Sequence, residues 1–354
     1  MTLSLATRTT LGVGGPARRH TRVTAQEAPG VLADARDAAE PVLVLGGGSN
    51  MLVADAGFPG VALELVASER PPIRRDGDLV HVDAHLEWDA LVAWACADDL
   101  AGIECLSGIP GRVGAAPMQN IGAYGQEIGE RLVSVDALEI ATGAVHTVAA
   151  ADCALGYRTS RFKHAEKDRW LVTGVTLRLA PGGPPTLRYA ELVRQAEEHG
   201  ATSLSAVRDL VLAIRARKSM VLDPSDPDAR SAGSFFTNPI VPESVADDVR
   251  ARAAGPVPSW PTETGTKLAA AWLIERSGFT RGWGDGPAGL STKHTLAVVN
   301  RGGATAADVT KVAATVRRGV RDAFGITLVP EPVFVGFAEG SDPSAVLDAA
   351  EAAL

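Results

Sequence analysis

The segment from Ile109 to Gly125 constrains this 354-residue chain more than any other part of its sequence. It reads Ile-Pro-Gly-Arg-Val-Gly-Ala-Ala-Pro-Met-Gln-Asn-Ile-Gly-Ala-Tyr-Gly, and its one charged residue is Arg112. A glycine-dense and nearly uncharged segment indicates backbone that approaches a ligand or another backbone closely. Gln119 and Asn120 add amide donors and acceptors that suit a flat polar heterocycle. From this segment alone, a ligand cradle and a buried crossover without a ligand both remain open.

A second glycine-rich turn, Gly46-Gly47-Gly48-Ser49-Asn50, directly follows the apolar stretch 41–45, which predicts a strand. Exposed N–H groups in such a turn can form a nest for phosphate oxygens, and Ser49 and Asn50 can add side-chain hydrogen bonds. The Rossmann fingerprint does not fit, because Met51 occupies the place of its third glycine, and no P-loop lysine follows. A tight loop without a ligand is the alternative interpretation of this turn.

The composition is that of an ordinary soluble protein, with 46% hydrophobic and 21% charged residues, and the length predicts two or three domains. The net charge of −8 argues against nucleic acid or an anionic membrane as a partner. The three cysteines, Cys96, Cys105 and Cys153, form neither a disulfide framework nor a metal motif. Because residues 1–10 also lack an apolar signal-peptide core, we expect a cytoplasmic protein without a bound metal.

Hydrophobic periodicity predicts helices and strands in mixed order, which favours the α+β class over a regularly alternating doubly wound sheet. Helices are expected over 27–40, from Trp88 to Ala95, through Val207, Val211 and Ile214 with Ser205 as a candidate N-cap, and from Thr305, where Asp308 completes a capping box. Strands are expected over 41–45, 61–66, 79–84, 133–140, 171–179 and 328–337. The run Pro181-Gly182-Gly183-Pro184-Pro185 predicts a hinge between a nucleotide-binding half and a second, α/β domain.

Taken together, the two glycine-rich segments resemble the FAD-binding domain of the p-cresol methylhydroxylase type. Their amino-acid sequences resemble those of the UDP-N-acetylenolpyruvoylglucosamine reductase family. Four further motifs in that family's order extend the resemblance from about Thr10 to Gly336: GYRTSRFK at 156–163, AGSFFTNP at 232–239, KLAAAWLIE at 267–275 and PEPVF at 330–334. The resemblance implies two α+β FAD-binding subdomains, 1–75 and 76–185, and a smaller α/β substrate-binding domain over 186–325. It also implies a C-terminal segment, 326–354, that returns the catalytic glutamate to the FAD site.

The resemblance implies a UDP-N-acetylmuramate dehydrogenase, in which NADPH reduces FAD and reduced FAD then reduces the enolpyruvyl group of UDP-N-acetylglucosamine enolpyruvate. FAD and NADPH are then the cofactors, and a UDP-sugar of cytoplasmic peptidoglycan synthesis is the small-molecule partner. We expect a monomer that binds neither nucleic acid nor a membrane. The alternatives are an FAD oxidase of the same fold that acts on an alcohol or lactone, and a nucleotide-binding regulator that has lost its chemistry.

The residues that the resemblance implies for cofactor binding come from both glycine-rich segments. Glycines would allow close backbone approach to FAD, and the amides of Gln119 and Asn120 would face its polar edges. The set is Gly46, Gly47, Gly48, Ser49, Asn50, Pro110, Gly111, Gly114, Ala115, Pro117, Gln119, Asn120, Ile121, Gly122, Ala123 and Tyr124.

Three residues are implied as catalytic: Arg158, Ser234 and Glu331. Ser234 matches the family's proton donor, which needs close placement because a serine hydroxyl is a weak acid in water. Arg158 is the expected counter-charge for negative charge that builds up beside the substrate carboxylate. Glu331 would oppose that carboxylate as an anion but can donate a hydrogen bond to it when protonated. By residue type alone, Ser234 is more often a loop hydroxyl, and Arg158 and Glu331 more often form a surface salt bridge.

The resemblance also implies substrate contacts from Tyr157, Tyr189, Lys218, Asn238, Trp260 and His294. Lys218 ends the basic run 214–218, which is otherwise typical of the solvated C-terminal end of a helix. Trp260 stands where many relatives have a tyrosine on a loop over the substrate, so it can stack but lacks the phenolic hydroxyl. Val333 takes the place of an arginine that many relatives carry, so Arg158 or another cation must hold more of the substrate's negative charge.

Overall fold

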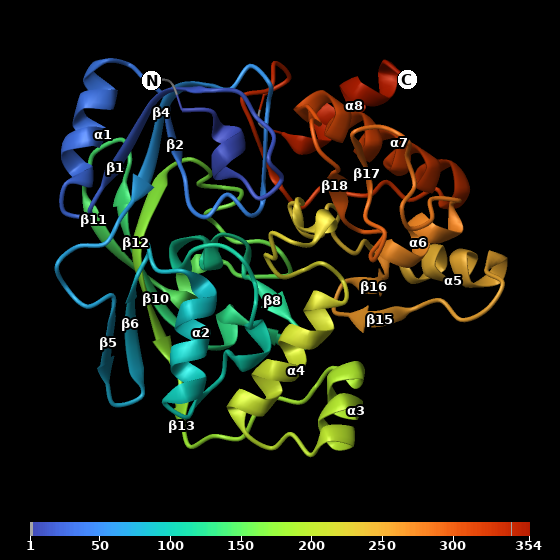
Figure 1. The fold of residues 1–354 in the computed structure, drawn as a ribbon, viewed down its shortest axis with the longest axis horizontal. Helices are drawn as coiled ribbons and strands as arrows, with labels where there is room; N and C mark the ends of the chain where they lie inside the picture. Colours follow the sequence, from blue (N-terminus) through green and yellow to red (C-terminus); the bar gives the residue numbers. More distant parts are fainter. Residues whose placement is uncertain (1–2, 341) are drawn as a thin grey trace. The chain divides into compact units, whose positions relative to one another are not determined.

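The computed structural model describes residues 3–340 and 342–354 and divides into two compact units (Figure 1). Unit 1 contains Ala17–Gly48 and Pro59–Leu222, and unit 2 contains Ser4–Pro16, Ser49–Phe58 and Asp223–Leu354. The chain therefore passes from one unit to the other inside the first glycine-rich turn, between Gly48 and Ser49. Residues 186–222 belong to unit 1, so the compact units do not follow the predicted division at residue 185.

The first sheet of unit 1 has the strand order β1-β4-β2. Its strands are β1 (Ala17–Val23), β2 (Val42–Val44) and β4 (Phe58–Leu65). Helix α1 (Ala28–Asp37) lies beside this sheet and buries Ala28, Leu32 and Ala35, which are spaced along one helical face (Figure 1). Strands β2 and β4 are parallel, with Val42 opposite Val61, so the segments that follow them leave the same edge of the sheet.

The second sheet of unit 1 is antiparallel and has the order β11-β10-β12-β6-β5. Its strands are β5 (Ile73–Asp76), β6 (Leu79–Asp83), β10 (Leu132–Glu139), β11 (Val145–Ala149) and β12 (Trp170–Arg178). Val175 of the central strand pairs with Val135 on one side and Val82 on the other, and all three are buried. The buried face of this sheet confirms the strands predicted at 79–84, 133–140 and 171–179, and it shares one hydrophobic core with helix α2 (Trp88–Ala97).

Short elements connect these sheets within unit 1. They are β7 (Leu100–Ala101), 3₁₀-helix η2 (Glu104–Leu106), η3 (Val113–Gln119), β8 (Gly122–Ala123), β9 (Gln126–Glu127), η4 (Ile128–Glu130), η5 (Ala150–Cys153) and β13 (Ala180–Pro181). The predicted hinge at 181–185 begins as a paired strand, because Pro181 of β13 lies opposite Leu100 of β7.

Helices α3 (Ala190–His199) and α4 (Leu204–Ala216) complete unit 1. Their apolar faces, with Leu192, Val207, Val211 and Ile214, form a core together with Cys105 of η2, and this packing keeps them in unit 1. The N-cap of α4 is Ser203 rather than the predicted Ser205, since the Ser203 hydroxyl accepts the backbone N–H of Ala206 at 3.2 Å.

Within the described residues, unit 2 combines short sheets with four α-helices and two 3₁₀-helices around a second core. Its strands are β3 (Met51–Val53), β14 (Ile240–Val241), β15 (Ser259–Thr262), β16 (Gly265–Leu268), β17 (Ala288–Leu290), β18 (Val298–Asn300) and β19 (Val333–Val335). Its helices are η1 (Leu5–Arg8), η6 (Pro227–Ala229), α5 (Glu243–Arg252), α6 (Ala270–Arg276), α7 (Ala306–Phe324) and α8 (Pro343–Ala352). The C-terminal strand β19 runs parallel to β3, which directly follows the first glycine-rich turn.

Helix α7 begins at the predicted capping box, in which Thr305 and Asp308 bond each other's backbone N–H groups. The apolar face of the helix is buried at Val309, Val316 and Val320. On the same helix, the buried Arg317 forms ion pairs at 2.6 and 2.7 Å with Asp348 and Glu351 of α8. These bonds fix the C-terminal helix to unit 2.

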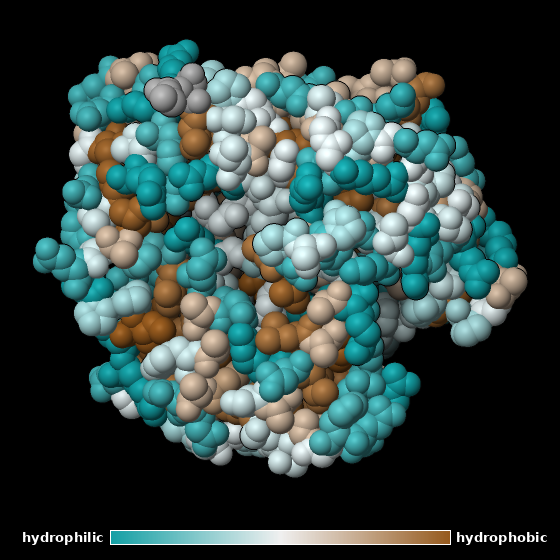
Figure 2. Space-filling view, in the orientation of Figure 1, coloured by the Kyte–Doolittle hydropathy of each residue, from teal (hydrophilic) through white to brown (hydrophobic). Residues whose placement is uncertain are grey.

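The arrangement confirms the predicted α+β class, with strands and helices in mixed order rather than in regular alternation. On the face drawn in Figure 2, hydrophobic residues form separate patches among hydrophilic ones. The large exposed apolar side chains, such as Val145, Leu222 and Val329, lie far apart in the sequence. Within the described residues, every helix is too short or too polar to cross a bilayer.

Candidate functional site

The two glycine-rich segments lie against each other in unit 1, and they touch through backbone. A Cβ added to Gly47 would lie 2.7 Å from the Cα of Gly111, a distance that real Cβ atoms do not reach. A Cβ on Gly114 would lie 2.6 Å from the Cβ of Ala84. The backbone N–H of Gly114 donates to the carbonyl of Ala84 at 3.0 Å and fixes this approach. The close backbone approach predicted from glycine density is therefore present in both segments.

A cavity of about 250 Å³ opens in unit 1 beyond the end of strand β4. Leu65 and Val66, at the end of β4, form one wall, and the glycine turn follows β2 at the same edge of the sheet. Cavities at the carboxyl ends of parallel strands are the usual ligand sites of such sheets. The lining residues are Ala25, Gln26, Leu65, Val66, Ser68, Arg70, Arg74, His81, Val82, Asp83, His85, Asp136, Thr173, Gly174 and Val175.

The polar lining of this cavity is held by side-chain pairs from neighbouring strands. Arg74 binds the carboxylate of Asp83 at 2.9 Å, and the His81 ring bonds the hydroxyl of Thr176 at 3.0 Å. Burial lowers the pKa of His85, Asp83 opposes this shift, and the neighbouring Arg112 adds to it. Sequence reasoning missed all of the cavity residues, because their proximity follows from strand order and not from a local pattern.

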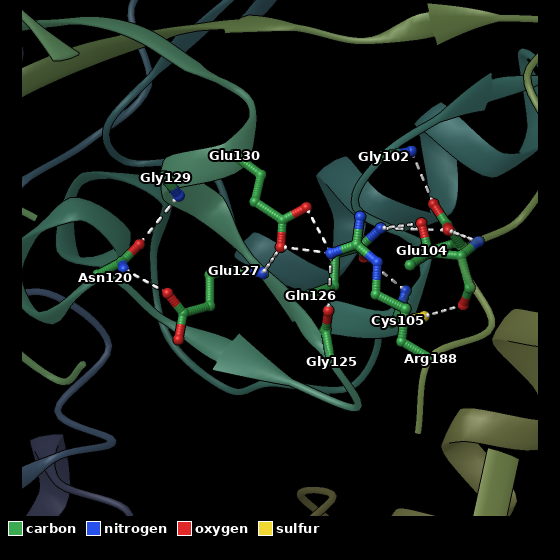
Figure 3. A network of polar contacts seen from close by, with 11 residues as sticks. Gly102, Glu104, Cys105, Asn120, Gly125, Gln126, Glu127, Gly129, Glu130 and Arg188 are labelled. Atoms are coloured by element: carbon green, nitrogen blue, oxygen red, sulfur yellow. Dashed lines mark hydrogen bonds and ion pairs between the residues drawn. The ribbon is translucent and has the colours of Figure 1, made fainter. Parts of the chain in front are cut away.

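Asn120, predicted as a cofactor contact, is buried and uses its side-chain amide inside unit 1 (Figure 3). Its Nδ2 donates to Glu127 Oε2 at 2.7 Å and to the Gly156 carbonyl at 3.2 Å, while its Oδ1 accepts the N–H of Gly129 at 2.9 Å. The residue has a left-handed φ of +46°, which asparagine tolerates better than most residues. These bonds hold the end of the 109–125 segment in a fixed turn.

The fully buried carboxylate of Glu104 ties the residue that follows the predicted hinge to residues on either side of the 109–125 segment (Figure 3). It accepts the backbone N–H groups of Gly102 and Thr186, both at 2.7 Å, and the side-chain amide of Gln126 at 3.2 Å. Beside it, Arg188 forms an ion pair with Glu130 at 2.9 Å. Arg188 also donates to the carbonyl of Gly125 at 3.2 Å, so the chain after the 181–185 run is anchored to the end of the 109–125 segment.

The predicted catalytic Arg158 lies in unit 1 at a strained turn. Its φ is +55°, and a non-glycine residue in this region is typical of functional sites that store backbone strain. Its Nη2 donates to the carbonyl of Gly122 at 2.8 Å, and its guanidinium lies 5.5 Å from the ring centroid of Tyr157. Arg158 therefore contacts the predicted cofactor segment directly.

Tyr124 and Tyr189, both predicted ligand contacts, meet edge to face at 5.4 Å. Burial is the main cause that raises the pKa of Tyr124 to about 12, so this residue is a neutral phenol at physiological pH. The predicted Lys218 lies in the same unit and forms an ion pair at 3.2 Å with Glu191 of α3.

Arg215 is a cation that sequence reasoning assigned to the solvated end of a helix, and the structure corrects this assignment. Its Nε is buried and has no hydrogen-bond partner among the described residues, and its Nη2 donates to the Met220 carbonyl at 2.7 Å. Burial lowers the pKa of Arg215, Tyr124 and Asp89 oppose the shift, and Arg158 lowers the pKa further. The two positive charges of Arg158 and Arg215 therefore act on each other within unit 1.

Ser234 and Glu331, the other predicted catalytic residues, come together in unit 2. The backbone N–H of Glu331 donates to the carbonyl of Phe235 at 2.9 Å, and Glu331 is buried. The side-chain amide of Asn50 donates to the Glu331 carbonyl at 3.4 Å, and the Asn50 carbonyl accepts the N–H of Val333 at 2.9 Å. Three motifs far apart in the sequence thus form one cluster, and Phe235 lies fully buried behind Ser234.

The remaining predicted substrate residues also lie in unit 2. Asn238 accepts the first N–H of helix α6 from Ala270 at 2.9 Å. Trp260, on β15, is 43% exposed and stacks under the ammonium of Lys267, 5.9 Å from its ring centroid. The backbone N–H of His294 donates to the Ser291 hydroxyl at 3.2 Å and closes a turn. Among the described residues, no group of His, Cys, Asp and Glu is arranged to hold a metal ion.

Comparison with known proteins covers nearly the whole chain. Residues 22–149 match the profile of a family described as an FAD binding domain, and residues 224–335 match that of the C-terminal domain of UDP-N-acetylenolpyruvoylglucosamine reductase. The chain is 48% identical to the UDP-N-acetylenolpyruvoylglucosamine reductase of Thermobifida fusca over 347 residues, which cover 94% of this chain and 96% of that protein. It is 46% identical to the enzyme of the same name from Mycobacterium tuberculosis over 351 residues, with 94% of each chain covered.

A solved structure with the same fold is the UDP-N-acetylenolpyruvylglucosamine reductase (MurB) of Thermus caldophilus. The TM-score is 0.65 at 26% sequence identity, and the match covers 95% of this chain and 98% of that one. Both the sequence and the fold of this chain are therefore similar to those of one enzyme family over more than nine tenths of the chain.

Proposed function

The chain belongs to the UDP-N-acetylenolpyruvoylglucosamine reductase family, and from that premise we propose that it catalyses the NADPH-dependent reduction of UDP-N-acetylglucosamine enolpyruvate to UDP-N-acetylmuramate. The observation that carries this proposal is the 48% identity over 94% of this chain and 96% of the relative from Thermobifida fusca. FAD, when bound, would carry two electrons from NADPH to the enolpyruvyl group.

The residues of unit 1 fit an FAD molecule. The turn Gly46-Gly47-Gly48 would hold the diphosphate through its backbone N–H groups, which can form an anion-binding nest. Glycine is required at position 47, because its packing against Gly111 leaves no room for a side chain. The cavity of about 250 Å³ at the same sheet edge would hold another part of the cofactor, and its lining offers donors and acceptors to a heterocycle. The side chain of Asn120 would act by fixing the turn that follows, while Gly122 allows close backbone approach.

Arg158 would bind the carboxylate of the enolpyruvyl group and stabilise the negative charge that develops beside it during reduction. Its left-handed backbone and its bond to the Gly122 carbonyl hold the guanidinium in place before substrate arrives. Arg215, whose pKa is lowered by burial and also by the positive charge of Arg158, would be the cation that supplements Arg158, since Val333 replaces the arginine of many relatives.

Ser234 would donate the proton to the carbon next to the substrate carboxylate. The fully buried Phe235 and Phe236 exclude water behind it, and Gly233, with a φ of +73°, permits the turn that presents its hydroxyl. Glu331, held to the carbonyl of Phe235 through its own backbone N–H, would act on the same carboxylate.

Tyr157, Tyr189, Lys218, Asn238, Trp260 and His294 would contact the UDP-sugar. Lys218 supplies positive charge for the diphosphate, and Trp260 presents an exposed ring that can stack on the base or the sugar. We propose that the enzyme works as a cytoplasmic monomer whose product supports cell-wall synthesis and cell division.

Mass spectrometry of the product tests the proposed reaction. Incubation with NADPH and the enolpyruvyl UDP-sugar should give a product that has gained two hydrogen atoms, with one oxidised NADP formed for each. A substrate that is recovered unchanged while NADPH is consumed would contradict the proposal, and light scattering of the purified protein tests the monomeric state.

A further inference from the structure

Lys163 contacts the segment proposed to hold FAD through a side-chain hydrogen bond to Gln119. Its Nζ donates to the side-chain oxygen of Gln119 at 3.1 Å, although the two residues lie 44 positions apart in the sequence. Both side chains are half-buried, so this bond is partly shielded from water and from salt. The bond therefore places a positive charge next to Gln119.

A second link keeps this contact in register. The Ser160 hydroxyl donates to the carbonyl of Met118 at 2.5 Å and accepts the backbone N–H of Lys163 at 3.3 Å. Phe162, between them, is buried in the core of unit 1. The backbone positions of residues 118 and 163 are thus fixed to each other by one buried hydroxyl, which keeps the lysine side chain within reach of Gln119.

The chemistry of the two side chains determines how Gln119 is turned. An ammonium group only donates hydrogen bonds, so it must meet the oxygen of the carboxamide. The NH₂ group of Gln119 consequently points away from Lys163, and the neighbouring positive charge polarises it into a stronger donor. Without Lys163, the amide of Gln119 could present either its oxygen or its nitrogen to a ligand.

We propose, resting on the function proposed above, that Lys163 is a positioning residue that fixes Gln119 as a hydrogen-bond donor to the flavin ring and thereby favours the reduced cofactor. Hydride from NADPH brings two electrons and one proton, which adds one unit of negative charge to the bound ring. A polarised donor backed by an ammonium stabilises that added charge more than it stabilises the neutral oxidised ring. The protein thus tunes the cofactor through a hydrogen bond to the ring edge.

The test measures the affinity for oxidised FAD and the midpoint potential of the bound flavin in four proteins. Lys163→Met removes the charge and keeps the aliphatic stem, and Lys163→Arg keeps the charge. Lys167→Met removes one positive charge from the same loop and serves as the matched control. Lys163→Met should lose about tenfold of its preference for reduced over oxidised FAD, which corresponds to about 30 mV for a two-electron couple. Lys163→Arg and Lys167→Met should keep the wild-type potential.

A fifth protein, Gln119→Glu, covers the case in which Lys163→Met does not fold. Its carboxylate would pair with Lys163 and remove the donor, so its potential should also fall. Equal weakening of oxidised and reduced FAD in Lys163→Met, with an unchanged potential, would overturn the proposal and leave Lys163 a structural residue. Since neither measurement uses NADPH or the UDP-sugar, failure of wild-type protein to bind FAD would instead contradict the proposed function.

Discussion

Replacement of Gly47 by alanine tests the close contact between the two glycine-rich segments. The added Cβ would lie 2.7 Å from the Cα and 3.3 Å from the carbonyl carbon of Gly111. Since both of these atoms belong to the backbone, the strain can be relieved only by moving one segment away from the other. Gly46→Ala is the matched control, because its Cβ would meet only the Cβ of Ala115, at 3.7 Å.

The expected free-energy changes follow from these distances. Overpacking a close contact costs about 1–3 kcal/mol, and replacing glycine by alanine restores about 0.4–1 kcal/mol by restricting the unfolded chain. Gly47→Ala should therefore lower the free energy of unfolding of the FAD-free protein by about 1–2 kcal/mol. Gly46→Ala should leave it unchanged or slightly raised, since neither glycine has a positive φ within the described residues.

Urea unfolding of the FAD-free proteins, followed by circular dichroism, measures these changes, and FAD titration measures the effect on binding. A displacement of either segment should weaken FAD binding to Gly47→Ala by at least tenfold, which corresponds to about 1.4 kcal/mol. Equal unfolding free energies for the two variants, together with an unchanged FAD affinity of Gly47→Ala, would refute the close contact as the basis of the site.

Three further outcomes follow from the structure. Ser234→Ala should slow reduction of the enolpyruvyl group by about 10²-fold or more, while stopped-flow measurement shows an unchanged rate of flavin reduction by NADPH. Burial raises the pKa of Asp89, but hydrogen bonds from Arg208 and from the Gly108 N–H outweigh burial and lower the pKa below its ordinary value of 3.8. The ionised Asp89 therefore stabilises the folded protein above pH 3.8, and this contribution is lost as the pH falls through the lowered pKa. Asp89→Asn should therefore be less stable than wild type at neutral pH, and urea midpoints should converge at acid pH. Burial raises the pKa of the Cys153 thiol to about 11, so this thiol should react with iodoacetamide at neutral pH only after unfolding.

The sequence predicted the two glycine-rich segments well, because glycine density reports close backbone approach directly. Gly47 and Gly114 indeed stand where a Cβ would meet other atoms at less than 3.0 Å. The cavity at the end of β4 could not be predicted in the same way. Its residues come from strand β4 of the first sheet, from strands β5, β6, β10 and β12 of the second sheet, and from the loops beside them. Only the tertiary arrangement brings these residues together.

The position of Arg215 could have been predicted from its helical spacing, which the sequence analysis did not use. It follows Val207 and Val211 at intervals of four residues and therefore lies on the buried face of helix α4. The basic residues Arg217 and Lys218 around it favoured a solvated helix end, and both of them do form ion pairs with Glu191. Helical spacing was the better guide, because a long charged side chain on the apolar face buries its stem and remains only partly exposed.

The region of the predicted hinge at 181–185 forms a long-range contact that the local sequence does not predict. Proline and glycine correctly marked a break in regular structure, but the buried carboxylate of Glu104 captures the N–H of Thr186 just beyond it. This bond joins residues 82 positions apart, so it follows from the tertiary fold. The outcome is a boundary between units at Leu222, after helix α4 rather than before helix α3.

The most direct test of the central claim is a two-part measurement on the purified protein. Its absorbance spectrum should show bound flavin, and NADPH oxidation under anaerobic conditions should continue beyond one equivalent of enzyme only when the enolpyruvyl UDP-sugar is present. We expect one NADPH oxidised per sugar reduced. Sustained NADPH oxidation that is independent of the sugar, or a protein that binds no flavin, would contradict the assignment of this chain as a UDP-N-acetylenolpyruvoylglucosamine reductase.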